Sequence, residues 1–290
     1  MIDLQLHSYY SDGSSSPREL VMEAKHLSLT AIALTDHDTV DGIPEFLESG
    51  SEFKLNTIAG VEISTDADIP QNGSLHLLGL FIDHHQPELK TQLDFLRQHR
   101  HQRAEKILEK LKELGIEISR EELLQEAGFG SIGRPHIASL LKKKKVVPSL
   151  QAAFDQYLAK GKPAFVEKVK LPEAQAIQLI RRAGGLAILA HPHLMNYPTF
   201  LELEKKVISM KEMGLDGLEA YYSGMSKSFT NKLLELGKKF NLLISGGSDY
   251  HGKNKSGILM GTGSGNLHIP DSVYYHLKER WEKNKGRSRT

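Results

Sequence analysis

The 290-residue sequence predicts an α/β protein built around a closed (β/α) barrel that a helical segment interrupts. Short, nearly all-apolar runs recur along the chain, helical patterns lie between most of them, and this alternation stops between about residues 87 and 162. Apolar strands that alternate with helices are typical of a parallel sheet whose outer face is covered by helices. The simplest such arrangement is a barrel.

Seven runs have the length and composition of buried strands. They are IDLQLH (2–7), TAIALTDHD (30–38), TIAGVEIS (57–64), LHLLGLFI (75–82), LAILAHPH (186–193), DGLEAYY (216–222) and LLISGGSDYH (242–251). Helices are expected between most of these runs. The SPRE sequence at 16–19 is a capping box with proline at the first helical position, and PEAQAIQLIRRAGG and KSFTNKLLELGKKF repeat apolar residues every three or four positions.

The segment between the fourth and fifth runs has a helical pattern and no run typical of a strand. Apolar residues recur at helical spacing from 89 to 114 and stop at Gly115, a second capping box (SREE) follows at 119–122, and helices are expected at 134–144 and 150–159. We therefore expect a barrel domain formed by residues 1–96 and 163–290. Residues 97–162 would form an inserted helical domain that contributes to substrate binding.

Composition narrows the functional classes. The 37 Lys and Arg residues nearly balance 36 Asp and Glu residues, so no overall field favours nucleic acid or a membrane. The absence of cysteine excludes disulfides, thiolate metal sites and cysteine nucleophiles. No apolar run approaches the length of a membrane span and no leader pattern opens the sequence, so we expect a cytoplasmic protein. No pattern indicates a protein partner, and a monomer is the default expectation.

Acidic residues and histidines gather at the ends of the predicted strands. They are His7, Asp12, Asp36, His37, Asp38, Glu62, His191, His193, Asp249 and His251, and only His76 lies inside its run. In a (β/α) barrel the carboxyl ends of the strands share one face, where active sites are found. A lone histidine at a strand end is usually structural, but the repetition of these residue types on one face favours a common site.

Asp, Glu and His are suitable ligands for divalent ions such as Zn²⁺, Mn²⁺, Fe²⁺ or Mg²⁺. The candidates outnumber the ligands of one ion, so a cluster of more than one ion is expected. Clustered metals that share a carboxylate and a hydroxide are suited to in-line displacement at phosphorus. The predicted chemistry is hydrolysis of phosphate esters. The GRPH sequence at 133–136 could simply begin a helix, but we favour a phosphate-binding role for Arg134.

The motifs HSYYSDG, LTDHDTVDG, AGVEIS, LHLLG, GRPHIA, LAHPH and GGSDYH, in this order, resemble those of the PHP (polymerase and histidinol phosphatase) superfamily of metal-dependent phosphoesterases. They span nearly the whole chain. The helical insertion with GRPH is similar to the branch that contains 3′,5′-nucleotide phosphatases and the 5′-to-3′ exoribonuclease RNase AM. The resemblance implies a distorted (β/α)₇ barrel with up to three metals.

The resemblance also implies a role for each candidate residue. The first metal would be held by His7, Glu62 and Asp249, the second by Glu62, His76 and His191, and the third by Asp12, His37 and His251. Arg134, His136 and His193 would face the substrate phosphate. Asp36 and Asp38 are expected to orient the imidazole of His37, because ligating histidines usually donate their other N–H group to a carboxylate or carbonyl.

Gln5 departs from the family pattern, which has a histidine ligand of the first metal at this position. Positions 5 and 7 of a strand project to the same side, so Gln5 points where that imidazole would lie. Its neutral amide oxygen is a weaker ligand. We expect a working cluster with a weakly held first metal; a preference for a harder ion and a damaged site are the alternatives.

In the predicted mechanism, a hydroxide shared by the metals near Glu62 attacks phosphorus, Arg134 neutralises charge on the phosphoryl oxygens, and His193 or His136 assists the leaving oxygen. Asp249 is essential to this mechanism because it holds the first metal. The expected substrates are 3′,5′-bisphosphonucleotides or short 5′-phosphorylated RNA, with the lysine run 142–145 as a further basic surface. A histidinol-phosphate or other small-monoester phosphatase, and a catalytically silent nucleotide-binding module, are the alternatives.

Overall fold

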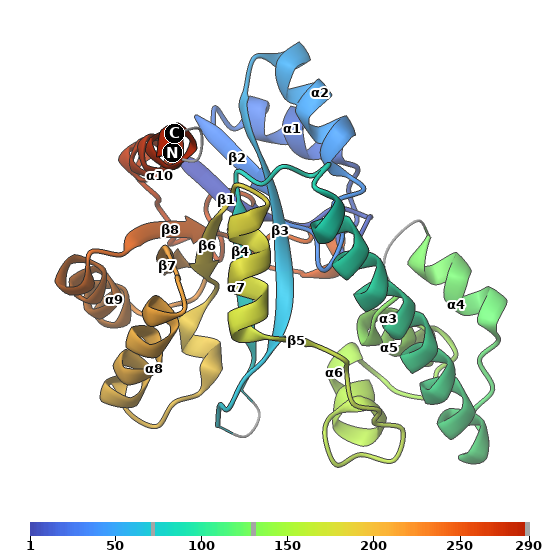
Figure 1. The fold of residues 1–290 in the computed structure, drawn as a ribbon. Coiled ribbons are helices and arrows are strands. Elements are labelled where there is room, and N and C mark those ends of the chain that lie inside the picture. Colours follow the sequence, from blue (N-terminus) through green and yellow to red (C-terminus); the bar gives the residue numbers. More distant parts are fainter. Residues whose placement is uncertain (71–72, 129–131, 288–290) are drawn as a thin grey trace.

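The computed structural model describes residues 1–70, 73–128 and 132–287, which form a mixed α/β fold around a nearly closed, barrel-like sheet (Figure 1). All seven predicted strands are present, and a two-residue strand, β5, is added. The strands are β1 (Ile2–Leu6), β2 (Ala31–Leu34), β3 (Asn56–Asp66), β4 (Leu75–Leu80), β5 (Leu171–Pro172), β6 (Leu186–Leu189), β7 (Gly217–Tyr222) and β8 (Leu243–Gly247).

The sheet has the order β1-β2-β3-β4-β6-β7-β8, with β5 paired to β3. The prediction of an all-parallel sheet is wrong at β4, which runs antiparallel to both β3 and β6. Only residues 67–74 connect β3 to β4, and a parallel crossover needs a dozen or more residues. The reversal brings the beginning of β4 to the edge of the sheet where the parallel strands end.

Hydrogen bonds just beyond the last strand join the two ends of the sheet. The Asp249 N–H group donates to the Gln5 carbonyl (3.1 Å), and the His7 N–H group donates to the Tyr250 carbonyl (3.0 Å). Gly247 allows this approach, because a Cβ atom at that position would lie 2.3 Å from the Cβ of Gln5. The first and last candidate ligands are thereby brought side by side.

Six helices surround the sheet (Figure 1): α1 (Pro17–His26), α2 (Ile43–Phe53), α7 (Glu173–Arg182), α8 (Phe200–Glu212), α9 (Lys227–Phe240) and α10 (Asp271–Arg287). The predicted capping box begins α1, since the Ser16 hydroxyl accepts a hydrogen bond from the Glu19 N–H group and the Glu19 carboxylate accepts one from the Ser16 N–H group. Within the described residues, no helix combines the length and apolarity needed to span a membrane.

The remaining helices gather on one side of the sheet (Figure 1): α3 (Pro87–Glu113), α4 (Arg120–Ala127), α5 (Arg134–Lys143) and α6 (Leu150–Ala153), which a π-helical turn (Phe154–Leu158) continues. They share a hydrophobic cluster that includes Leu111, Ile137 and Leu141. The first half of α3, with Leu89 and Leu96, packs instead into the barrel cluster. The helix crosses the expected boundary at 96/97 without a break, and the division into two domains stays a prediction.

Candidate metal centre and substrate cavity

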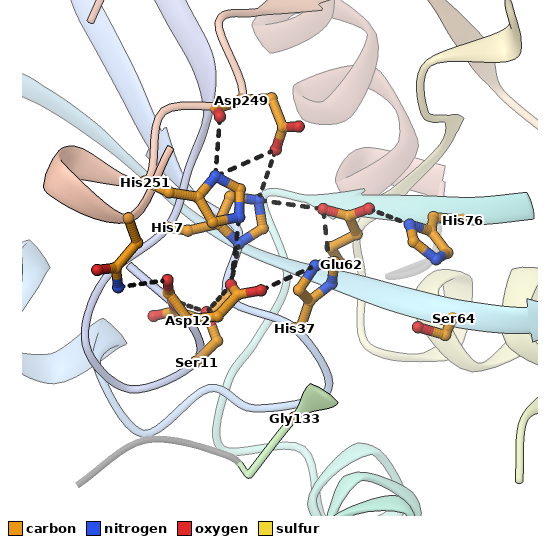
Figure 2. Close-up of polar contacts among 12 residues, drawn as sticks. His7, Ser11, Asp12, His37, Glu62, Ser64, His76, Gly133, Asp249 and His251 are labelled. Carbon is orange, nitrogen blue, oxygen red and sulfur yellow. Dashed lines mark hydrogen bonds and ion pairs between the residues drawn. The ribbon is translucent and has the colours of Figure 1, made fainter. Parts of the chain in front are cut away.

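The candidate ligands lie in or just after six strands, β1, β2, β3, β4, β6 and β8, and they converge at one end of the sheet. Figure 2 shows most of them. His7 follows β1, Glu62 lies in β3 and His76 lies near the beginning of β4. The antiparallel direction of β4 explains why His76 occupies the beginning of its run and not the end. His191 follows β6 and Asp249 follows β8, and both have positive φ angles, 30° and 58°. Such angles are strained for residues other than glycine and concentrate at functional sites.

The contacts around His7 are those of ligands that share an ion. Its Nε2 atom lies 3.1 Å from Glu62 Oε2 and 3.2 Å from Asp249 Oδ1. All three side chains are nearly or fully buried, yet within the described residues neither ring nitrogen of His7 makes a hydrogen bond. Buried polar atoms that approach closely without hydrogen-bond geometry are suited to a cation between them.

Three groups of side chains have ligand atoms within 4.8 Å of one another. They are His7, Glu62 and Asp249; His37, Glu62 and His76; and His7, Asp12, His37 and His251. The first group is the set implied for the first metal, and the third contains the set implied for the third metal. His191 is not in these groups, but its Nε2 lies 3.0 Å from Glu62 Oε1. All eight predicted ligands are therefore adjacent, and their individual roles stay predictions.

The electrostatics of Glu62, His37 and His76 also suit divalent cations. Burial opposes ionisation of Glu62, but contacts with the imidazoles of His37, His76 and His191 hold the pKa of its carboxyl well below the usual range. Burial lowers the pKa of His37 to about 3 and also lowers the pKa of His76, so both imidazoles are neutral at neutral pH. Charged carboxylates and neutral imidazoles are the forms that bind metals.

Gln5 lies beside the first group, as the sequence predicted. Its side chain is fully buried, and its Nε2 donates a hydrogen bond to Glu62 Oε2 (3.1 Å). Its Oε1 atom is buried with no hydrogen-bond partner in the described part of the chain. The amide is therefore in contact with the carboxylate that would bridge two metals.

The prediction that Asp36 and Asp38 orient His37 is wrong. Asp36 accepts hydrogen bonds from the Ser8 N–H group (2.7 Å) and from the hydroxyls of Ser8 and Ser11. Asp38 accepts from Arg100, Lys168 and the Ser64 N–H group. The first carboxylate thus holds the loop after β1, and the second connects the barrel to the helical segment.

A cavity of about 610 Å³ extends from the candidate ligands toward the helices. Asp12, His37 and His76 line one end of it and also line an adjoining cavity of about 260 Å³. Six cations line the larger cavity: Arg100, Arg103, Arg134, Lys160, Lys168 and Lys170. Of these, the sequence predicted only Arg134, because the others belong to a regular helix and an irregular segment without a motif.

Arg103 and Arg134 make no ion pair with a carboxylate in the described residues, although Glu167, which also lines the cavity, stabilises the charge of both. The Nε of Arg103 donates to the Val166 carbonyl (2.8 Å), and the Nη1 of Arg134 donates to the Leu158 carbonyl (3.1 Å). Burial, together with Arg134 and Arg100, lowers the pKa of Arg103 to about 10, so the guanidinium remains charged at neutral pH. Two neighbouring, partly buried cations of this kind favour a bound anion.

The other residues predicted to bind substrate are not part of this wall of six cations that line the larger cavity. The ring Nδ1 of His136 accepts a hydrogen bond from the Gly133 N–H group (3.1 Å). The His193 ring packs against Tyr222, with 4.8 Å between centroids. Neither histidine is among the described residues that line the two cavities, and their substrate roles stay predictions. The lysine run 142–145 does not line them either, and Lys143 pairs with Glu126.

Comparison with known proteins identifies the family that has this arrangement of residues. The model of the PHP domain family matches residues 3–181. The chain belongs to the PHP domain family. A 5′-3′ exoribonuclease from Haemophilus influenzae is 36% identical over 249 residues, which are 86% of this chain and 89% of that protein. A 3′,5′-nucleoside bisphosphate phosphatase from Chromobacterium violaceum is 29% identical over 257 residues, 88% of this chain and 89% of that protein.

A crystal structure from Bifidobacterium adolescentis, described as a metal-dependent phosphoesterase, superimposes on this PHP protein with a TM-score of 0.83. The two are 27% identical, and the match covers 95% of this chain and 94% of the other. These findings confirm the PHP resemblance, the barrel-like α/β fold and the predicted class of enzyme, a hydrolase of phosphate esters. They support divalent metals as cofactors.

Proposed function

We propose that this PHP protein hydrolyses phosphate esters of nucleotides that carry a second phosphate nearby. Both 3′,5′-bisphosphonucleotides and the 5′ end of short RNA meet this description. The observation that carries the proposal is the single cavity that has candidate metal ligands at one end and a wall of cations along its side. One phosphate would be cleaved at the ligands while the wall holds the other.

Each part of the site has a chemical role in this reaction. Divalent ions held by the eight ligands would supply an activated water as nucleophile and positive charge at the phosphoryl oxygens. Arg103 and Arg134 would bind the second phosphate, because their guanidinium groups make no ion pair with a carboxylate in the described residues. Ile69, Phe154 and Phe165 also line the cavity and offer apolar surface to the base or ribose.

Two alternatives are less consistent with the site. Histidinol phosphate carries an amino group, which is protonated at neutral pH, and a cavity lined by six cations would repel it. A silent module is favoured only by Gln5. Metal analysis that found one ion or fewer per chain, together with no phosphate release from any substrate, would support the silent module.

The function is tested by phosphate release in Mn²⁺, Zn²⁺ or Mg²⁺ from 3′,5′-bisphosphonucleotides, short 5′-phosphorylated RNA, histidinol phosphate and p-nitrophenyl phosphate. Arg134→Ala should raise KM for the substrates with two phosphates by about 10–100-fold, the value of one or two charge-assisted hydrogen bonds. KM for p-nitrophenyl phosphate should change little. Lys143→Ala, on the same helix but outside the cavity, is the control. Equal effects of Arg134→Ala on all substrates would refute the assignment of the second phosphate.

A further inference from the structure

Lys168 is a cavity residue to which the mechanism above gives no role of its own. It lies in the irregular segment before β5, and its Nζ donates hydrogen bonds to Asp38 Oδ2 (3.1 Å) and to the hydroxyl of Ser64. Ser64 is two positions beyond Glu62 on β3, so both side chains project to the same side of the strand. The strand register also pairs Ser64 with His76. The ammonium group is thereby held at the end of the cavity where the phosphoryl group would react.

The surroundings of Lys168 favour release of a proton. Asp38 is its carboxylate partner, but the same Oδ2 atom also accepts from the Nε of Arg100 (2.9 Å). Burial, with Arg100 and Arg103 nearby, lowers the pKa of Lys168 to about 7 although Asp38 opposes this shift. The charge of Lys168 also acts on His76, whose pKa it helps to lower. An ammonium that ionises near the working pH is suited to general acid catalysis.

The histidines predicted to assist the leaving oxygen are less suited to this step. The ring of His193 packs against Tyr222, and His193 is not among the described residues that line the two cavities. His136 is buried, and burial lowers its pKa. Its Nδ1 already accepts a hydrogen bond from the Gly133 N–H group. An ammonium has three N–H donors, and the contacts with Asp38 and Ser64 use two of them.

We propose that Lys168 is the residue that donates a proton to the leaving oxygen, an inference that rests on the proposed function. As hydroxide derived from water bonds to phosphorus, the bond between phosphorus and the leaving oxygen breaks, and its electron pair stays on that oxygen. The oxygen takes a proton from Nζ and departs as the alcohol. The neutral amine regains a proton from solvent, so one water is consumed for each phosphate and alcohol released.

The test compares leaving groups of different acidity. Lys168→Met and Lys168→Arg should lower kcat by about 10²–10⁴-fold for a 3′-phosphonucleotide, whose ribose alkoxide needs a proton to leave. For p-nitrophenyl phosphate, whose leaving group is stable as an anion, kcat should fall less than about tenfold. Lys162→Met, in the same segment and exposed, is the control. Metal content and circular dichroism of each variant show whether the fold and the metal site are kept.

The pH profile is a second measurement. In the wild type, kcat for the nucleotide should fall as pH rises through about 7, because Lys168 loses its proton, and this limb should be missing from Lys168→Arg. Equal losses for both leaving groups in folded, metal-loaded variants would overturn the proposal and leave Lys168 a binding or structural residue. A metal-loaded wild type that released phosphate from neither substrate would overturn the proposed function, and this inference with it.

Discussion

Replacement of Gln5 by histidine should tighten metal binding at the group formed by His7, Glu62 and Asp249. Gln5 is fully buried, and its Nε2 lies 3.1 Å from Glu62 Oε2. Its Oε1 atom, without a hydrogen-bond partner in the described residues, is the ligand atom that the present side chain can offer. An imidazole at this position would replace that neutral oxygen with a stronger nitrogen ligand.

The size of the effect follows from the place of Gln5 in the site. Changes to groups that only support a metal ligand alter affinity by about 10–100-fold. A change of the ligand itself should therefore give at least about tenfold, or ~1.4 kcal/mol. In excess metal this difference adds to the free energy of unfolding. It should raise Tm by roughly 3 °C for a chain of this size.

The stability of the metal-free variant must first be compared with that of the metal-free wild type. Without metal, Gln5→His exchanges one buried acceptor for another, because neutral imidazole also carries an acceptor nitrogen, and it can lose the hydrogen bond to Glu62, a cost of about 1 kcal/mol. The informative quantity is therefore the part of the Tm shift that depends on metal. Metal content after dialysis against a weak chelator, measured by mass spectrometry, gives an independent readout.

Gln5→Leu is the matched control, because leucine has a similar volume and no ligand atom. The expected order of metal retention is Gln5→His, then wild type, then Gln5→Leu. If Gln5→His retains no more Mn²⁺ or Zn²⁺ than the wild type and shows the same metal-dependent Tm shift, then position 5 is not a ligand position in this chain. The interpretation of the first site would then be wrong.

Three further variants test the site and the fold. Asp249→Ala should lower phosphatase kcat by roughly 100-fold or more in metal-replete buffer, since it removes a ligand; unchanged turnover would contradict the assignment. Leu111→Ala should lower the free energy of unfolding in urea by about 2–5 kcal/mol, whereas exposed Leu114→Ala should cost far less; equal costs would refute the role of the helical cluster. Gly247→Ala should lower the free energy of unfolding in urea by about 1–3 kcal/mol, because its Cβ would overlap Gln5. A free energy of unfolding equal to that of the wild type would contradict the close approach of β8 to β1.

The sequence predicted the strands and the candidate ligands well because both follow a local pattern. Each strand is a short apolar run, and each candidate ligand lies at or near one end of such a run. The direction of β4 is not visible in such a pattern, and the prediction of a parallel strand failed there. Two signals were nevertheless present: the connection at 67–74 is too short for a crossover, and His76 stands at the beginning of its run.

The cation wall could not be predicted in the same way. Arg100 and Arg103 lie on a long helix among many other charged residues, and Lys168 lies in a segment with no periodicity. Their positions depend on how α3 packs against the barrel, which is long-range information. The lysine run 142–145 was the more conspicuous basic feature of the sequence, yet Lys143 pairs with Glu126 outside the cavity. A dense run of charged residues in the sequence therefore did not identify the cations that line the cavity.

The packing of α3 explains how the two halves of the site are joined. Its first turns are anchored in the barrel core through Leu89 and Leu96, and its later turns belong to the helical cluster through Leu111. Arg100 lies between these two anchors and pairs with Asp38, which directly follows the candidate ligand His37. A rigid helix fixed at both ends holds the cations at a set distance from the ligands. If the proposed function holds, the fold would set the spacing between the reacting phosphate and the second phosphate and would select substrates by the separation of their phosphates.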